Sequence, residues 1–119
     1  MEEMVEHWKH EPDGHDYPAA RDYLTLLMKA TEADKIIKAL QKAGPIHRKA
    51  KDILRASALE LLPMDNKHVA AHLEEVRHGA KLSPVLLVRG NPLIIADGYH
   101  RVCASYWIDE DAPVPCRMV

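Results

Sequence analysis

The stretch that most constrains this chain runs from Leu93 to Arg101, where an apolar segment is followed at once by a glycine turn. The run up to Ala96 predicts a short buried strand, Gly98 predicts the turn, and Tyr99 opens a predicted helix. A helix start leaves its first backbone N–H groups unpaired and carries partial positive charge, so this turn is suited to receiving an anion. Because the Arg101 guanidinium adds a planar fork of donors, we expect the anion to be a phosphate.

Composition limits what this stretch can belong to. With 119 residues, of which 47% are hydrophobic, the chain is expected to be one soluble domain with one core. A net charge of −2 gives no general field for attracting nucleic acid. The acidic start, residues 1–6, lacks the apolar core of a signal peptide, and no apolar run approaches the ~20 residues of a membrane span. We therefore expect a cytoplasmic protein without a membrane partner, in which Cys103 and Cys116 are reduced and buried.

The first third of the sequence predicts a loosely held arm and then a pair of amphipathic helices. His7, His10 and His15 lie in the arm without a fixed ligand spacing, which favours an arm over a metal site. Asp16 is the expected cap of the first helix, and Thr31 with Asp34 resembles a capping box for the second. The apolar face of the first helix is expected to comprise Ala20, Tyr23, Leu24, Leu27 and Met28, and that of the second Ala33, Ile36, Ile37 and Leu40.

The remaining sequence alternates short apolar strands with helices. The expected elements are a strand at Ile46–Ala50, a single helical turn at Lys51–Leu54, a helix at Lys67–His78 capped by Asp65 or Asn66, a hairpin of Pro84–Val88 and Leu93–Ala96, a helix with the apolar stripe Tyr99, Val102, Cys103 and Tyr106, and a strand at Val114–Val119. This order predicts an α+β fold, a small mixed sheet with flanking helices that an N-terminal helix pair precedes. We assign residues 1–45 to the arm and helix pair and 46–119 to the sheet domain, and expect one compact unit.

Two further clusters allow more than one interpretation. The densest basic run comprises His47, Arg48, Lys49, Lys51 and Arg55. A solvated face is the favoured interpretation of this run, and flanking an anionic ligand is the alternative. His68 and His72 are spaced i, i+4 on a helix, with Glu75 as a possible third metal ligand. The zinc-protease glutamate is missing from this spacing, which favours an exposed histidine flank.

Three segments in this order, Leu82–Val88, Ile95–Ala104 and Ala112–Arg117, resemble the amino-terminal domain of ParB and of sulfiredoxin. In that superfamily an acid-Gly-x-x-Arg or Gly-Cys-His-Arg turn follows a strand, the next helix holds nucleotide phosphates, and a Val-Pro-x-x-Val strand closes the sheet. The resemblance covers the chain from about Lys49 onward and implies a standalone ParB-like domain with the ParB/sulfiredoxin-like sheet.

The superfamily offers three chemistries. Sulfiredoxins carry a nucleophilic cysteine where Tyr99 stands, and a phenol cannot replace a thiolate. Partition proteins of the ParB type need a helix-turn-helix domain, and because the sequence ends at Val119 we do not expect sequence-specific DNA binding from this chain. Free amino-acid kinases carry an Asp-Gly-His-His-Arg turn, to which residues 97–101 are similar at every position but one.

The resemblance and the chemistry of the turn together suggest a role for each residue. Gly98, Tyr99, His100 and Arg101 are the candidate phosphate- or nucleotide-binding residues, and Asp97 and His100 the candidate catalytic ones. Asp97 suits a Mg²⁺ ion bridging phosphates or a base toward an acceptor hydroxyl, with a plain N-cap as the alternative. The alternatives for the other two side chains are an ion pair of Arg101 with Asp97 or with the 109–111 loop, and core packing of Tyr99.

These roles predict a nucleotide-binding ParB-like protein that hydrolyses a nucleoside triphosphate with Mg²⁺ or transfers a phosphoryl group, either an NTPase or a small-molecule kinase. A non-enzymatic module in which the nucleotide regulates partner binding is the alternative from another class. A ParB-like nuclease is the weakest alternative, because the acidic chain has no evident cluster of metal-binding carboxylates. The base, the phosphoryl acceptor and the oligomeric state, a homo-oligomer included, stay open.

Overall fold

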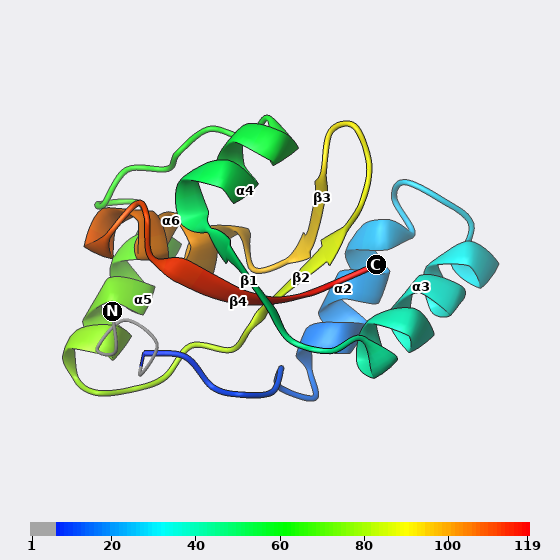
Figure 1. Ribbon diagram of the computed structural model, residues 1–119, viewed down its shortest axis with the longest axis horizontal. Coiled ribbons are helices and arrows are strands. Elements are labelled where there is room, and N and C mark those ends of the chain that lie inside the picture. The colour runs from blue at the N-terminus through cyan, green and yellow to red at the C-terminus, as the bar shows by residue number, and fades with distance from the viewer. Residues whose placement is uncertain (1–6) are drawn as a thin grey trace.

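In the computed structural model, which describes residues 7–119, a four-stranded mixed sheet lies between two layers of helices (Figure 1). Along the sheet the strand order is β1-β4-β2-β3, and the bounds are β1 Ile46–Lys49, β2 Val85–Val88, β3 Ile94–Asp97 and β4 Pro113–Met118. The β1–β4 and β2–β3 pairs are antiparallel, whereas the central β2–β4 pair is parallel. The predicted α+β class, a small mixed sheet with flanking helices, is confirmed.

The helices divide between the two faces of the sheet. Two helices, α2 (Asp16–Leu24) and α3 (Ala30–Lys42), cover one face, on the right in Figure 1. The other face carries α4 (Ala50–Ser57), α5 (Lys67–Arg77) and α6 (Tyr99–Ile108). The N-terminal helix pair thus forms one complete layer of the fold.

Strand β2 explains why the sheet needs both layers. Side chains alternate between the faces of a strand, so Val85 and Leu87 join the core beneath α4 and α6, while Leu86 and Val88 join the core beneath α2 and α3. All four residues of β2 are buried. A strand that is apolar at every position is typical of a sheet covered on both sides.

The elements with the strongest local signals are confirmed. The predicted hairpin is the antiparallel β2–β3 pair. The predicted 67–78 helix is α5, for which Asn66 provides the cap by accepting hydrogen bonds from the backbone N–H groups of His68 and Val69. Cys103 and Cys116 are buried free thiols, as expected.

The arm is the first correction, because residues 7–15 are held rather than loose. Trp8 is 5% exposed and belongs to the core. Backbone hydrogen bonds join His7 and Lys9 to Leu82, and the buried Arg117 donates to the His10 carbonyl at 3.1 Å. Residues 1–6 of the predicted arm lie outside the described residues.

The helix starts are the second correction. Asp16 is the first residue of α2 rather than its cap, a position that His15 occupies. The Thr31–Asp34 capping box is wrong, because α3 starts from Lys29 without a side-chain cap and Asp34 pairs with Arg21 at 2.6 Å.

The apolar stripes and the predicted single turn also need correction. On the predicted stripe of α2, Tyr23 and Leu27 are 44% and 52% exposed, whereas Ala20 and Leu24 are buried and Met28 packs partly buried against the same core. Because α2 ends at Leu24, Leu27 does not continue its helical face. The predicted helical turn at 51–54 extends into α4, an eight-residue helix.

Candidate functional site

The corner between β3 and α6 depends on Gly98. This residue is the N-cap of α6 and has φ +112°, in the left-handed region that side chains rarely adopt. A Cβ built on it would lie 3.0 Å from the Val85 Cγ2 atom and 3.0 Å from the Arg101 Nη2 atom. The glycine therefore lets β3 turn directly into a helix in close contact with Val85 of β2.

The start of α6 presents unpaired backbone donors. The N–H of Val102 donates to the Gly98 carbonyl at 3.0 Å, which closes the first helical turn. Within residues 7–119 the N–H groups of Tyr99, His100 and Arg101 have no hydrogen-bond acceptor, and no side chain caps the helix. Three donors with the positive end of the helix dipole behind them favour an anion at this point.

The Arg101 guanidinium faces the protein rather than solvent. Its Nε donates to the Ser83 carbonyl at 2.9 Å, and its Nη2 donates to the Pro84 carbonyl at 3.2 Å and to the Asp97 carboxylate at 3.1 Å. Its side chain is only 12% exposed. Arg101 thus fastens the start of α6 to the segment before β2 and to the end of β3, and among the described residues its Nη1 is left without an acceptor.

A second carboxylate, that of Asp16, approaches the same guanidinium. Asp16 is 2% exposed, and its Oδ2 lies 4.0 Å from the Arg101 Nη2 atom and accepts the Asp13 N–H at 3.0 Å. Burial raises the pKa of the Asp97 carboxyl above its ordinary value, an effect that the Arg101 charge opposes and the neighbouring Asp16 adds to. No local sequence pattern predicts Asp16 at this corner, because its partners on β3 and α6 are distant in the chain.

Asp97 fits direct Mg²⁺ coordination poorly. Its carboxylate is already hydrogen-bonded to Arg101 at 3.1 Å, and the Asp16 carboxylate lies 4.0 Å from the same guanidinium nitrogen, so a Mg²⁺ ion would have to compete with a cation that is already in place. In the described part of the chain, one group of three potential ligand atoms comes within 4.8 Å of one another, from Asp13, His15 and Asp16. The predicted α5 set of His68, His72 and Glu75 does not form such a group there.

Histidines from two helices meet beside the α6 start. The ring centroids of His100 on α6 and His68 on α5 lie 4.7 Å apart, and the His72 Nδ1 lies 3.5 Å from the Glu75 carboxylate. Burial lowers the pKa of His100 below its ordinary 6.5, and the charges of His68, His72 and Arg101 lower it further. The pKa of His72 is also lowered, mainly by burial. His68 was predicted only as a member of the α5 flank, and its contact with His100 depends on how α5 packs against α6.

The Tyr99 ring lies beside these histidines, with its centroid 5.5 Å from that of His100. Its hydroxyl donates to the Glu60 carbonyl at 2.5 Å, and its ring packs against the core that includes Val102 and Cys103. Of the five residues of the predicted turn, the fold therefore brings Asp97 and Arg101 together and directs His100 toward α5. Tyr99 packs against the core, which is one of the two environments expected for it.

Comparisons with known proteins identify no relative of this chain. No family model, curated protein or solved structure matches this chain. Within residues 7–119, no helix has both the length and the apolar character needed to cross a membrane.

Proposed function

We propose that the chain is a phosphate-binding module that takes a nucleotide at the β3–α6 corner. The observation that carries this proposal is the set of three unpaired N–H groups of residues 99–101, which lies at the start of a ten-residue helix beside two histidine rings. Backbone donors of this kind suit phosphate oxygens because they need no rearrangement before binding.

Each residue of the corner has a separate part in this proposal. Gly98 allows the ligand to approach the backbone closely, and the Nη1 of Arg101 supplies the remaining donors of a guanidinium that is otherwise held by the protein. His100 gains a proton as the phosphate arrives, because the ligand charge favours the imidazolium form, and the His68 ring lies beside it with the two centroids 4.7 Å apart. The ParB/sulfiredoxin resemblance of the turn supports a nucleotide over a simple phosphate ester.

Phosphoryl transfer is a second candidate, and one observation favours it. Burial raises the pKa of Asp97 toward the range that a general base needs at neutral pH. We rank this candidate second because the same carboxylate is hydrogen-bonded to Arg101, so an acceptor hydroxyl has to compete for it.

The binding proposal is tested by titrating the protein with ATP, ADP, CTP and GTP, with and without Mg²⁺, and following backbone amide resonances by NMR. We expect the amides of residues 98–101 to shift with at least one nucleotide. The double variant His68→Ala with His100→Ala should weaken binding about tenfold, or ~1.4 kcal/mol. His78→Ala is the matched control, because His78 is an exposed histidine at the far end of α5 that pairs with Glu74. Shifts confined to other regions, or no shift at all, would overturn the proposal.

The pH dependence of nucleotide affinity is an independent test of the role of the histidines. Because the pKa of His100 in the free protein lies below 6.5 and phosphate raises it, the complex takes up a proton. Affinity should therefore increase as the pH falls from neutrality toward the lowered pKa of His100, and the double histidine variant should lose this increase. An affinity that rises with pH contradicts the assigned role of the histidines.

Turnover separates the two candidates. The module proposal predicts nucleotide binding without release of phosphate, whereas the transfer candidate predicts phosphate release that Asp97→Asn abolishes while binding persists. DNA cleavage in the presence of Mg²⁺ or Mn²⁺ would instead favour the nuclease alternative.

A further inference from the structure

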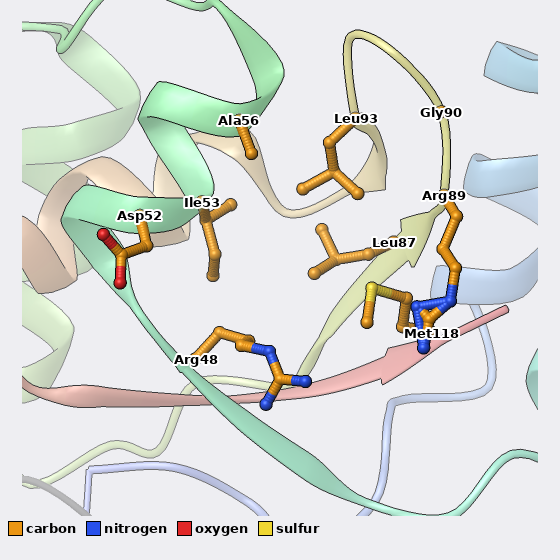
Figure 2. A pocket seen from close by; sticks show the side chains of 9 residues that line it. All are labelled: Arg48, Asp52, Ile53, Ala56, Leu87, Arg89, Gly90, Leu93 and Met118. Atoms are coloured by element: carbon orange, nitrogen blue, oxygen red, sulfur yellow. The ribbon is translucent and has the colours of Figure 1, made fainter.

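A pocket of about 280 Å³ lies at the opposite end of β3 from the β3–α6 corner. Its apolar lining includes Ile53 from α4, Leu87 from β2, Leu93 from the hairpin loop and Met118 from β4 (Figure 2). We call this hollow the hairpin pocket. Its volume is close to the lower end of the range for small-molecule sites, so it suits a small ligand.

Two arginines from different elements border the hairpin pocket. Arg48 belongs to β1 and Arg89 follows β2, and Figure 2 shows both side chains reaching toward Met118 from opposite sides. Both residues are exposed, and neither forms an ion pair with a carboxylate of the described residues. The one side-chain hydrogen bond of Arg48 in this part of the chain goes to the adjacent His47 carbonyl, at 2.9 Å.

The remaining charged group at the hairpin pocket is Asp52, so the pocket has a positively charged side and a negatively charged side. Asp52 lies on α4, and in Figure 2 its carboxylate points away from the side where the Arg48 and Arg89 guanidinium groups lie. An anion is attracted by the Arg48 and Arg89 guanidinium groups on the Met118 side of the pocket and repelled by the Asp52 carboxylate. The apolar surface of Ile53, Leu87 and Leu93 lies between these two sides.

From this arrangement we infer that the hairpin pocket binds a small organic oxyanion with a short apolar body. The two guanidinium groups hold the oxyanion near Met118, since their donor forks match the geometry of carboxylate and phosphate oxygens. The apolar body rests on Ile53, Leu87 and Leu93. Carboxylate and phosphate share this recognition chemistry, and the test below distinguishes them. This site does not depend on the function proposed for the β3–α6 corner.

Methyl and amide NMR titrations of the whole chain test the inference with three probes. Hexanoate supplies a carboxylate, phenyl phosphate supplies a phosphate, and hexan-1-ol is the uncharged control. We expect at least one anionic probe to shift the methyl resonances of Leu87, Leu93 and Met118, and hexan-1-ol to shift them less. The anion that gives the tighter binding identifies the preferred oxyanion. Shifts absent from these methyl groups with both anions, or equal for hexan-1-ol, overturn the inference.

Charge variants then test the polarity of the pocket. The double variant Arg48→Gln with Arg89→Gln should weaken anion binding roughly 3- to 10-fold, and Asp52→Asn should strengthen it about 2-fold. Arg55→Gln is the matched control, because Arg55 is an exposed arginine of α4 that does not border the hairpin pocket. Amide spectra of each variant verify that it folds. Unchanged affinity in the double arginine variant, or an equal loss in Arg55→Gln, contradicts recognition by these two side chains.

Discussion

The two ends of β3 use arginine in opposite ways. At the Asp97 end, Arg101 is 12% exposed and donates to the carbonyls of Ser83 and Pro84 and to the Asp97 carboxylate. At the Leu93 end, Arg48 and Arg89 are exposed beside an apolar hollow and pair with no carboxylate of the described chain.

The burial of each guanidinium determines what its arginine does. A guanidinium that is mostly removed from water must find acceptors in the protein, so its first effect is on the structure of the corner. An exposed guanidinium stays hydrated until a ligand arrives. The motif arginine therefore mainly positions the α6 start and keeps only its Nη1 free of acceptors in the described residues, whereas Arg48 and Arg89 have most of their donors to spare.

The largest expected effect comes from removing the motif arginine. Arg101→Ala leaves the half-buried Asp97 and the buried Asp16 without their cation and the Ser83 and Pro84 carbonyls without a donor. Breaking a buried pair in this way costs about 3–5 kcal/mol of unfolding free energy. Urea unfolding followed by circular dichroism measures this loss.

Arg55→Ala serves as the control for Arg101→Ala, since it removes an exposed arginine that no carboxylate of residues 7–119 pairs with. Its unfolding free energy should stay within about 0.5 kcal/mol of the parent value. Equal stability losses in the two variants would show that Arg101 does not hold the corner together.

Gly98→Ala is expected to have the next largest effect. The new Cβ meets Val85 and Arg101 at 3.0 Å, and φ +112° is strained for any L side chain. Strain of this kind costs about 1–3 kcal/mol. Gly14→Ala is the matched control, because nothing lies within 4 Å of the Cβ that it would add. A thermal midpoint for Gly98→Ala as high as that for Gly14→Ala would mean that the corner relaxes, and would weaken the case for a fixed backbone there.

Local signals predicted most of the sheet and helices, and burial on both faces makes β2 apolar at every position. The β2–β3 hairpin and the Asn66 cap of α5 are examples in which neighbouring residues determine the structure. The Thr31–Asp34 capping box was wrong for the opposite reason. Asp34 lies close enough to Arg21 of α2 to form a 2.6 Å ion pair, and the sequence near α3 carries no sign of that partner.

The candidate site was less accessible to sequence reasoning for the same physical cause. The ion pair between Asp97 and Arg101 was one expected alternative, because i and i+4 residues across a helix start can meet. The approach of Asp16 and the contact between His68 and His100 depend instead on the packing of α2 and α5 against the corner. The hairpin pocket could not be predicted because its lining comes from several elements, although the basic run that contains Arg48 is compatible with a neighbouring anion.

Loss of either exposed arginine at the Leu93 end of β3 should hardly change the stability of the fold. Arg48→Gln and Arg89→Gln, made singly, should each change the unfolding free energy by less than about 0.5 kcal/mol, because neither side chain is buried or paired with a described carboxylate. Urea unfolding under the conditions used for Arg101→Ala measures both variants. A loss above ~1 kcal/mol for either variant would mean that its guanidinium is needed by the fold, as that of Arg101 is. Near-neutral stability together with weakened anion binding would instead assign these two arginines to recognition, since a side chain that contributes little to folding is free to be selected for a ligand.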